Sequence, residues 1–88
     1  MFIRDLIWDE ENLDHIATHN VEPDEVEDVC YGSALVERAS EGKHVLLGQT
    51  ADGRYLFVVV AHKGKGVFRV ITARDMTESE RRRFSRRR

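Results

Sequence analysis

Basic and imidazole side chains are concentrated in the second half of the chain, and they are the residues best suited to chemistry. Eight of them lie between positions 43 and 74: Lys43, His44, Arg54, His62, Lys63, Lys65, Arg69 and Arg74. A neutral histidine or lysine can remove the proton of a ribose 2′-hydroxyl, while guanidinium groups stabilise the charge that develops on the adjacent phosphate. The same side chains can also simply hold phosphates. Composition alone leaves both chemistries open.

Other kinds of site have less support. His15 and His19 have the i, i+4 spacing of a zinc-binding helix, but the sequence places no third ligand beside them. Cys30 lies on an apolar helical stripe with Val26 and Val29, which favours a buried, inert thiol. No serine has the context of a nucleophile elbow. We therefore predict no metal and no cofactor.

Charge is divided unevenly along the chain. Residues 1–42 hold two arginines and twelve acidic residues, whereas residues 43–88 hold twelve lysines and arginines and four acidic residues. The last eight residues alone contain six arginines. A basic pole of this kind attracts polyanions, unless the fold interleaves the two halves so that they neutralise each other.

The length of 88 residues predicts a single domain over residues 1–88, with 85–88 as a basic tail. The apolar runs are too short to span a membrane, and the N-terminus does not resemble a signal peptide. We therefore expect a cytoplasmic protein without a membrane partner. The single cysteine excludes an internal disulfide.

The elements that must position the basic residues follow from periodicity. Residues 2–8 have a pattern typical of a first strand. Asp9 is typical of a helix N-cap, and acidic residues follow it in the first turn of that helix. Asn20 suits the left-handed position that ends this helix. Pro23 suits the first turn of a second helix that ends before Gly32.

Strand patterns follow at residues 34–39, 43–50, 54–63 and 67–74, separated by short turns that contain glycine. The third of these patterns is apolar on both faces, which places it centrally in the sheet. Thr77 and Glu80 then form the capping box of a last helix. The predicted fold class is α+β: a strand, two helices, a four-stranded antiparallel meander and a C-terminal helix. On a straight strand Arg69 and Arg74 would point to opposite faces.

Several short motifs, in their order and spacing, resemble one family across nearly the whole chain. They are Ile7-Trp8-Asp9 with Asn12, His19-Asn20-Val21 before an acidic helix, and Arg69-Val-Ile-Thr-Ala-Arg74 followed by Thr77-Glu-Ser-Glu-Arg-Arg-Arg-Phe84. The family is that of the BrnT toxins of bacteria. The resemblance implies a RelE-like fold, a metal-independent endoribonuclease that inhibits translation, and a cognate antitoxin of the ribbon-helix-helix type. It also implies operator DNA binding only through that antitoxin, and a homodimer within the complex.

Carried over by position, Arg69 and Arg74 match the two strand arginines of the family, and Arg81 to Arg83 match its basic terminal helix. The sequence departs from the family where Lys43-His44 stands in place of a Glu-Arg pair. We predict Lys43 or His44 as proton acceptor, Arg69 or Arg74 as phosphate clamp and His62 as a reserve general acid. The predicted RNA-binding residues are Arg54, Lys63, Lys65, Arg81 and Arg82.

Two alternatives remain open at this point. A catalytically silent relative would bind RNA or a partner protein through the same basic residues. A DNA-binding regulator would use the arginine tail, but the sequence has no helix-turn-helix or ribbon-helix-helix pattern. The tail, Arg86-Arg87-Arg88, would add phosphate affinity, dock on an acidic antitoxin segment, or remain a solvated terminus.

Overall fold

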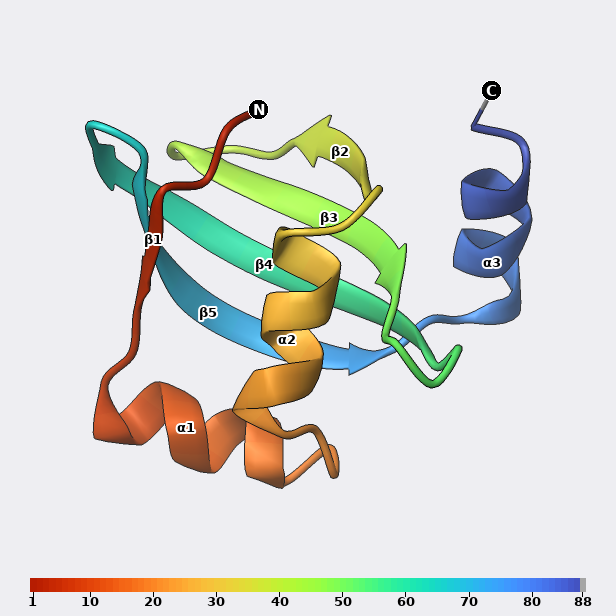
Figure 1. The fold of residues 1–88 in the computed structure, drawn as a ribbon, viewed down its shortest axis with the longest axis horizontal. Coiled ribbons are helices and arrows are strands. Elements are labelled where there is room, and N and C mark those ends of the chain that lie inside the picture. The colour runs from red at the N-terminus through yellow and green to blue at the C-terminus, as the bar shows by residue number, and fades with distance from the viewer. Residues whose placement is uncertain (88) are drawn as a thin grey trace.

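The computed structural model describes residues 1–87, so the part of the predicted basic tail at Arg88 lies outside the described residues. Residues 1–87 form five strands and three helices, shown in Figure 1. In chain order they are β1 (Asp5–Ile7), α1 (Glu10–Ala17), α2 (Pro23–Cys30), β2 (Leu35–Arg38), β3 (Lys43–Gln49), β4 (Tyr55–Gly64), β5 (Val67–Asp75) and α3 (Glu78–Ser85). The order confirms the α+β architecture predicted from the sequence.

The strands form one mixed sheet in the order β1-β5-β4-β3-β2. Strands β2 to β5 are the predicted antiparallel meander. As predicted, β4 is central: it is the middle strand of the five-stranded sheet. The short β1 adds to the outer edge of β5 in parallel, with Ile7 opposite Arg69. The sequence pattern had predicted β1 as a strand but gave no information on where it pairs.

The helix boundaries follow the predicted caps. The Asp9 carboxylate accepts a hydrogen bond from the backbone N–H of Asn12 at 2.8 Å and caps the N-terminus of α1. Asn20 has the positive φ of 59° expected after α1, and Pro23 is the first residue of α2. Thr77 and Glu80 complete a capping box at α3.

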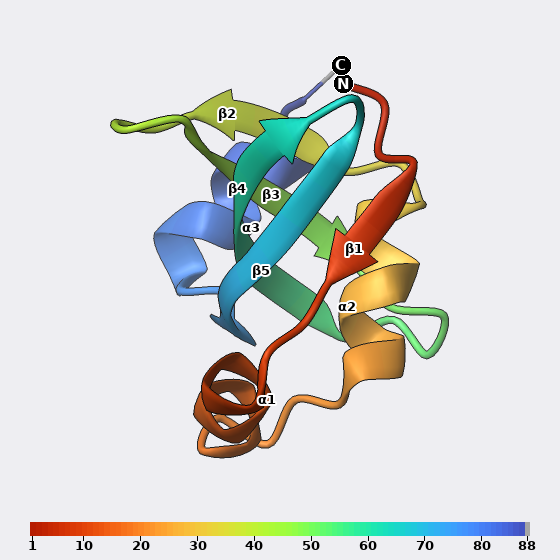
Figure 2. The ribbon, with the colours of Figure 1, turned by 90° about the vertical axis from the view of Figure 1, so that its left-hand side faces the viewer.

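The sheet carries a different hydrophobic cluster on each face. Figure 2 shows α2 and α3 on opposite sides of the sheet. On one face α1 and α2 pack through Ile16, Val26 and Val29, and we call this the helix face. Gly48 lets α2 approach closely, since a Cβ there would lie 3.0 Å from Val29 Cγ1. The strand residues in this cluster are Leu46, Leu56, Val58, Val60, Phe68, Val70 and Ala73.

The other face is covered in part by α3. Phe84 and Met76 pack there with Leu47 and Phe57, which are neighbours on β3 and β4. We call this the arginine face, because it also carries Lys43, Arg69 and Arg74. In the described residues no helix is long and apolar enough to cross a membrane.

A β-bulge in β5 corrects the predicted orientation of the two strand arginines. Val70 pairs with Val60, but Thr72 pairs with Val59, so Ile71 is an extra residue without a partner on β4. The extra residue shifts the alternation by one position. Arg69, opposite Ala61, and Arg74, opposite Phe57, therefore share one face, whereas a straight strand would have separated them.

Candidate functional site

The arginine face presents three of the predicted catalytic residues, from the two strands that flank β4. Lys43 on β3 and Arg69 on β5 are both opposite Ala61 of β4, so they lie in one row across the sheet, about 10 Å apart at the backbone. Arg74 lies further along β5, in the row of Phe57 and Leu47. The register therefore brings Lys43, Arg69 and Arg74 onto one surface.

Two predicted imidazoles lie on the helix face instead. His44 is opposite Val60 and His62 is opposite Phe68, and both of these partners belong to the helix-face core. The two imidazole rings flank Phe68, with centroids 6.0 Å (His44) and 4.8 Å (His62) from that of the phenyl ring. The five predicted catalytic residues are thus split between the two faces of the sheet.

Arg69 is fixed by the start of α1. Its Nη2 lies 3.2 Å from Oδ2 of Asp9, the residue that caps the helix. The side-chain amide of Asn12 lies against the β5 bulge. In the orientation that satisfies both its nitrogen and its oxygen, the nitrogen donates to the Val70 carbonyl at 3.0 Å and to the Asp9 carboxylate at 2.9 Å. Asp9 and Asn12 of this motif therefore have a structural explanation: Asn12 supports the bulge and Asp9 holds Arg69.

Arg74 is held by α3. Nη1 and Nη2 donate to the two carboxylate oxygens of Glu80, at 2.9 and 3.0 Å, and Nη1 also donates to the Asp75 carbonyl. The hydrogen bonds from Arg74, followed by those from Thr77, lower the pKa of Glu80 against the effect of desolvation. The sequence pattern predicts Glu80 as a capping residue alone, because its second partner, Arg74, belongs to another element.

Arg54, a predicted RNA-binding residue, makes four hydrogen bonds within the protein. Nε donates to Asp75 at 2.8 Å, Nη1 to Glu25 and to the Asn20 carbonyl, and Nη2 to the His19 carbonyl. These bonds tie the start of β4 to the α1–α2 junction. With four donor contacts used inside the fold, the guanidinium has little capacity left for a phosphate.

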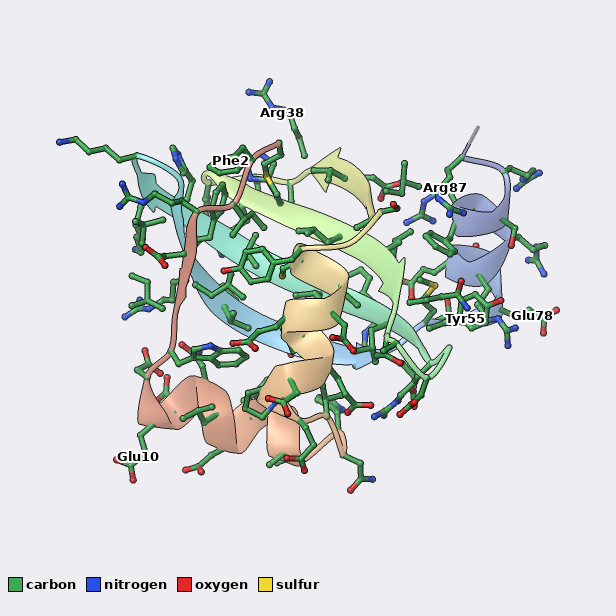
Figure 3. All side chains as sticks on the ribbon, viewed as in Figure 1. Phe2, Glu10, Arg38, Tyr55, Glu78 and Arg87 are labelled. Carbon is green, nitrogen blue, oxygen red and sulfur yellow. The ribbon has the colours of Figure 1, made fainter. Side chains whose placement is uncertain are left out.

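The other predicted RNA-binding residues lie at opposite ends of the sheet. Lys63 and Lys65 are exposed at the β4–β5 hairpin, while Arg81 and Arg82 lie on α3. Figure 3 shows this hairpin and α3 at opposite edges of the molecule. The Arg81 guanidinium stacks on the Tyr55 ring at 3.9 Å, and Arg82 pairs with Glu78 at 3.1 Å. Both line a shallow hollow of about 620 Å³ along α3.

A smaller cleft of about 350 Å³ lies between α1 and β5. It is lined by Glu11, Asn12, His15, Ile71 and Thr72. Thr72 is opposite Val59 and therefore belongs to the arginine face. The sequence could not indicate this cleft, because it depends on the bulge at Ile71.

No metal centre is apparent in residues 1–87, where no three histidine, cysteine, aspartate or glutamate side chains are grouped suitably for an ion. Cys30 is buried, and desolvation, with a smaller effect of Glu27, raises the pKa of its thiol to about 12. The predicted burial of Cys30 is therefore confirmed.

The chain matches a family model and is similar to a solved structure. Residues 8–80 match the sequence model of a family described as the ribonuclease toxin, BrnT, of type II toxin-antitoxin systems. The fold is similar to the 1.1 Å crystal structure of the Brucella abortus ribonuclease toxin BrnT, with a TM-score of 0.70 and 23% sequence identity over 84% of this chain and 97% of that one. Among curated proteins, none matches the chain significantly. The matched region covers most of the sequence, and the chain therefore belongs to the BrnT family of ribonuclease toxins of type II toxin-antitoxin systems.

Proposed function

We propose that this chain is a metal-independent endoribonuclease that cleaves RNA and thereby inhibits translation, and that the arginine face is its RNA-binding surface. The observation that carries the proposal is the shared orientation of Arg69 and Arg74, which results from the bulge at Ile71. Two guanidinium groups and the Lys43 ammonium on one surface suit an RNA backbone, whose phosphates need several cations at once.

Each cation has a distinct proposed role. Lys43 and Arg69, in one row across the sheet, contact the scissile phosphate and stabilise the negative charge of its transition state. Arg74 contacts a neighbouring phosphate, since three of its N–H donor contacts already go to Glu80 and Asp75. The Lys43 ammonium lies 3.4 Å from Glu41, an arrangement that favours a charge-stabilising role over the proton-acceptor role.

Affinity for RNA extends beyond the cleavage site. Arg81 and Arg82 on α3, and Lys63 and Lys65 at the β4–β5 hairpin, are proposed to contact the RNA backbone on either side of the scissile phosphate. The stacking of Arg81 on Tyr55 also offers a surface suited to an unpaired base. We leave Arg54 out of this surface because its guanidinium donates hydrogen bonds within the protein. We leave out His44 and His62 because they lie on the helix face.

The antitoxin that the family implies is proposed to be a ribbon-helix-helix protein, and the complex to bind operator DNA through it. We further propose that two copies of this chain assemble within that complex. Light scattering of the co-expressed pair tests the assembly, and a mobility shift with and without the antitoxin tests whether the DNA contact depends on it.

The proposed activity is tested with the purified chain, a labelled RNA and an excess of EDTA. We expect cleavage products that end in a 2′,3′-cyclic phosphate, and a loss of about 100-fold or more in rate for Arg69→Ala. Glu10→Gln, on the exposed start of α1, is the control. RNA that is bound but remains intact would instead favour the catalytically silent binding module.

Expression of the chain alone in a bacterial host is the matching experiment in cells. Growth arrest with fragmented RNA, relieved by Arg69→Ala or Arg74→Ala, is expected. Normal growth with intact RNA, from protein that is soluble and folded, would contradict the ribonuclease proposal.

A further inference from the structure

We infer that Glu11 and His15 of α1 form the proton-transfer pair of this ribonuclease, with Glu11 as the base and His15 as the acid. The inference rests on the proposed RNA cleavage at the arginine face and assigns the one function that face lacks. Its cations can hold and stabilise a phosphate, but transesterification also needs groups that accept and donate a proton.

The two side chains lie together on one side of the helix. Positions 11 and 15 are four residues apart, so their side chains are neighbours along the helix surface. Both line the 350 Å³ cleft with Asn12, Ile71 and Thr72, and both residues are exposed to solvent. An exposed carboxylate and imidazole beside a concave surface are accessible to a bound RNA strand.

The cleft lies beside the proposed phosphate-binding residues and shares Thr72 with the arginine face. Thr72 of the cleft lies between Arg69 and Arg74 on the arginine face, two positions from each along the facing strand β4, which is about 6.8 Å. Asp9, which pairs with Arg69, accepts a hydrogen bond from Asn12 of the cleft. A phosphate held by Arg69 would therefore lie next to the opening of the cleft.

The other imidazoles are less well placed. His44 and His62 lie on the helix face, with the sheet between them and the arginines. His19 contacts His15 edge to face, with ring centroids 5.4 Å apart, but it does not line the cleft. Among the described residues, His15 is the histidine that lines this cleft beside the arginine face.

The reaction balances without any co-reactant. Glu11 accepts the proton of the ribose 2′-hydroxyl as the O2′–P bond forms. The P–O5′ bond breaks, and the departing O5′ takes a proton from His15. The products are a 2′,3′-cyclic phosphate and a 5′-hydroxyl, and proton exchange with water returns Glu11 to its carboxylate and His15 to its imidazolium form.

A substrate with a modified leaving group separates the two roles. In an RNA whose scissile O5′ is replaced by sulfur, the leaving thiolate needs no protonation, so a missing acid no longer matters. For purified His15→Gln we expect a rate loss of about 100-fold or more on the oxygen substrate and near wild-type cleavage of the sulfur substrate. For Glu11→Gln we expect a similar loss on both substrates, because the base is needed in either case.

Matched controls come from α1 and from the turn that follows it. Glu10→Gln and His19→Gln change the same residue types outside the cleft, and we expect both to stay within about threefold of the wild type. Circular dichroism melts of all four variants verify that the exposed substitutions leave the fold intact.

The outcomes distinguish the inference from the proposed function. Normal cleavage by Glu11→Gln and His15→Gln, together with a loss in Arg69→Ala, would overturn the proton-transfer pair and leave the ribonuclease proposal intact. A His15→Gln variant that is equally slow on both substrates would overturn its role as acid. If the wild type cleaves neither substrate, both proposals are wrong.

Discussion

Arg74 and Glu80 join β5 to α3 through a bidentate ion pair, in which Nη1 and Nη2 of the guanidinium lie 2.9 and 3.0 Å from the two carboxylate oxygens. The guanidinium also lies over the Phe57 ring, with Cζ 3.8 Å from the ring centroid. The Glu80 side chain is only 12% exposed. Loss of this pair would therefore weaken the attachment of α3 to the arginine face.

We predict that Glu80→Gln lowers the free energy of unfolding by about 2 kcal/mol at neutral pH, because a charged, partly buried hydrogen-bonded pair is lost. Glutamine keeps one accepting oxygen for the Thr77 amide and so retains the capping box, while the charge and one of the two hydrogen bonds from Arg74 are lost. Urea denaturation measures it. Glu78→Gln is the control, since Glu78 is 88% exposed and, within residues 1–87, pairs with Arg82 of the same helix alone.

The same pair gives a pH dependence. Arg74 lowers the pKa of Glu80 in the folded state, so folding favours the carboxylate. Its contribution to stability is complete above the ordinary glutamate pKa of about 4.3 and is lost as the pH falls through the lower pKa of the folded state. The stability difference between wild type and Glu80→Gln should therefore shrink as the pH is lowered below about 4.3. A difference that is constant down to pH 2 would contradict this account.

Arg54 is predicted to act as a structural residue. Arg54→Lys would remove most of the bonds to Asp75, Glu25 and the carbonyls after α1, and we expect a loss of about 2–3 kcal/mol in the free energy of unfolding. Thermal and urea unfolding measure the change. Arg38→Lys, at an exposed position of the edge strand β2, should change stability by less than about 0.5 kcal/mol. Equal effects of the two substitutions would show that the Arg54 contacts contribute little.

The sequence predicted the elements well where the signals are local. Caps at Asp9 and Thr77, the proline of α2 and the glycines of the hairpins act within a few residues, so the helices and the meander could be placed. Strand alternation predicted opposite faces for Arg69 and Arg74, which is wrong, and no local signal assigned faces to the other basic residues. The bulge at Ile71 depends on pairing with β4 and on support from Asn12, which is 59 residues away, and neither has a local signature.

The candidate site was the hardest part to predict, because its arrangement depends on contacts between distant segments. Lys43 and His44 are adjacent in sequence and were grouped by chemistry, yet neighbouring residues of a strand point to opposite faces. The contacts of Arg54, with partners in α2, in β5 and after α1, likewise become visible only once these segments meet. The resemblance to a family identified Arg69 and Arg74 by position, whereas residue type alone could not separate them from the other cations.

His44 provides a direct test of this division between faces. Its Nδ1 is buried and has no hydrogen-bond partner in the described residues, and the ring packs against Phe68. We predict that His44→Leu keeps or raises the free energy of unfolding, by up to about 1 kcal/mol, because an unsatisfied buried nitrogen is replaced by apolar atoms. RNA cleavage should persist, whereas a catalytic His44 would make this variant inactive. Lys43→Gln, the neighbour on the arginine face, should reduce cleavage at unchanged stability.

Cys30 should report the opening of the α2 core. Its side chain is buried beside Val26 and Val29 of the same helix, and burial raises the pKa of the thiol to about 12, so little reactive thiolate exists at neutral pH. We predict that a thiol reagent labels Cys30 in the native protein only at the rate at which this region opens, and rapidly in concentrated urea. Destabilising variants such as Arg54→Lys should accelerate native labelling in proportion to their loss of stability, as long as reclosing is faster than labelling. Rapid labelling of the stable wild type, at a rate close to that in urea, would contradict the burial of Cys30 in the core.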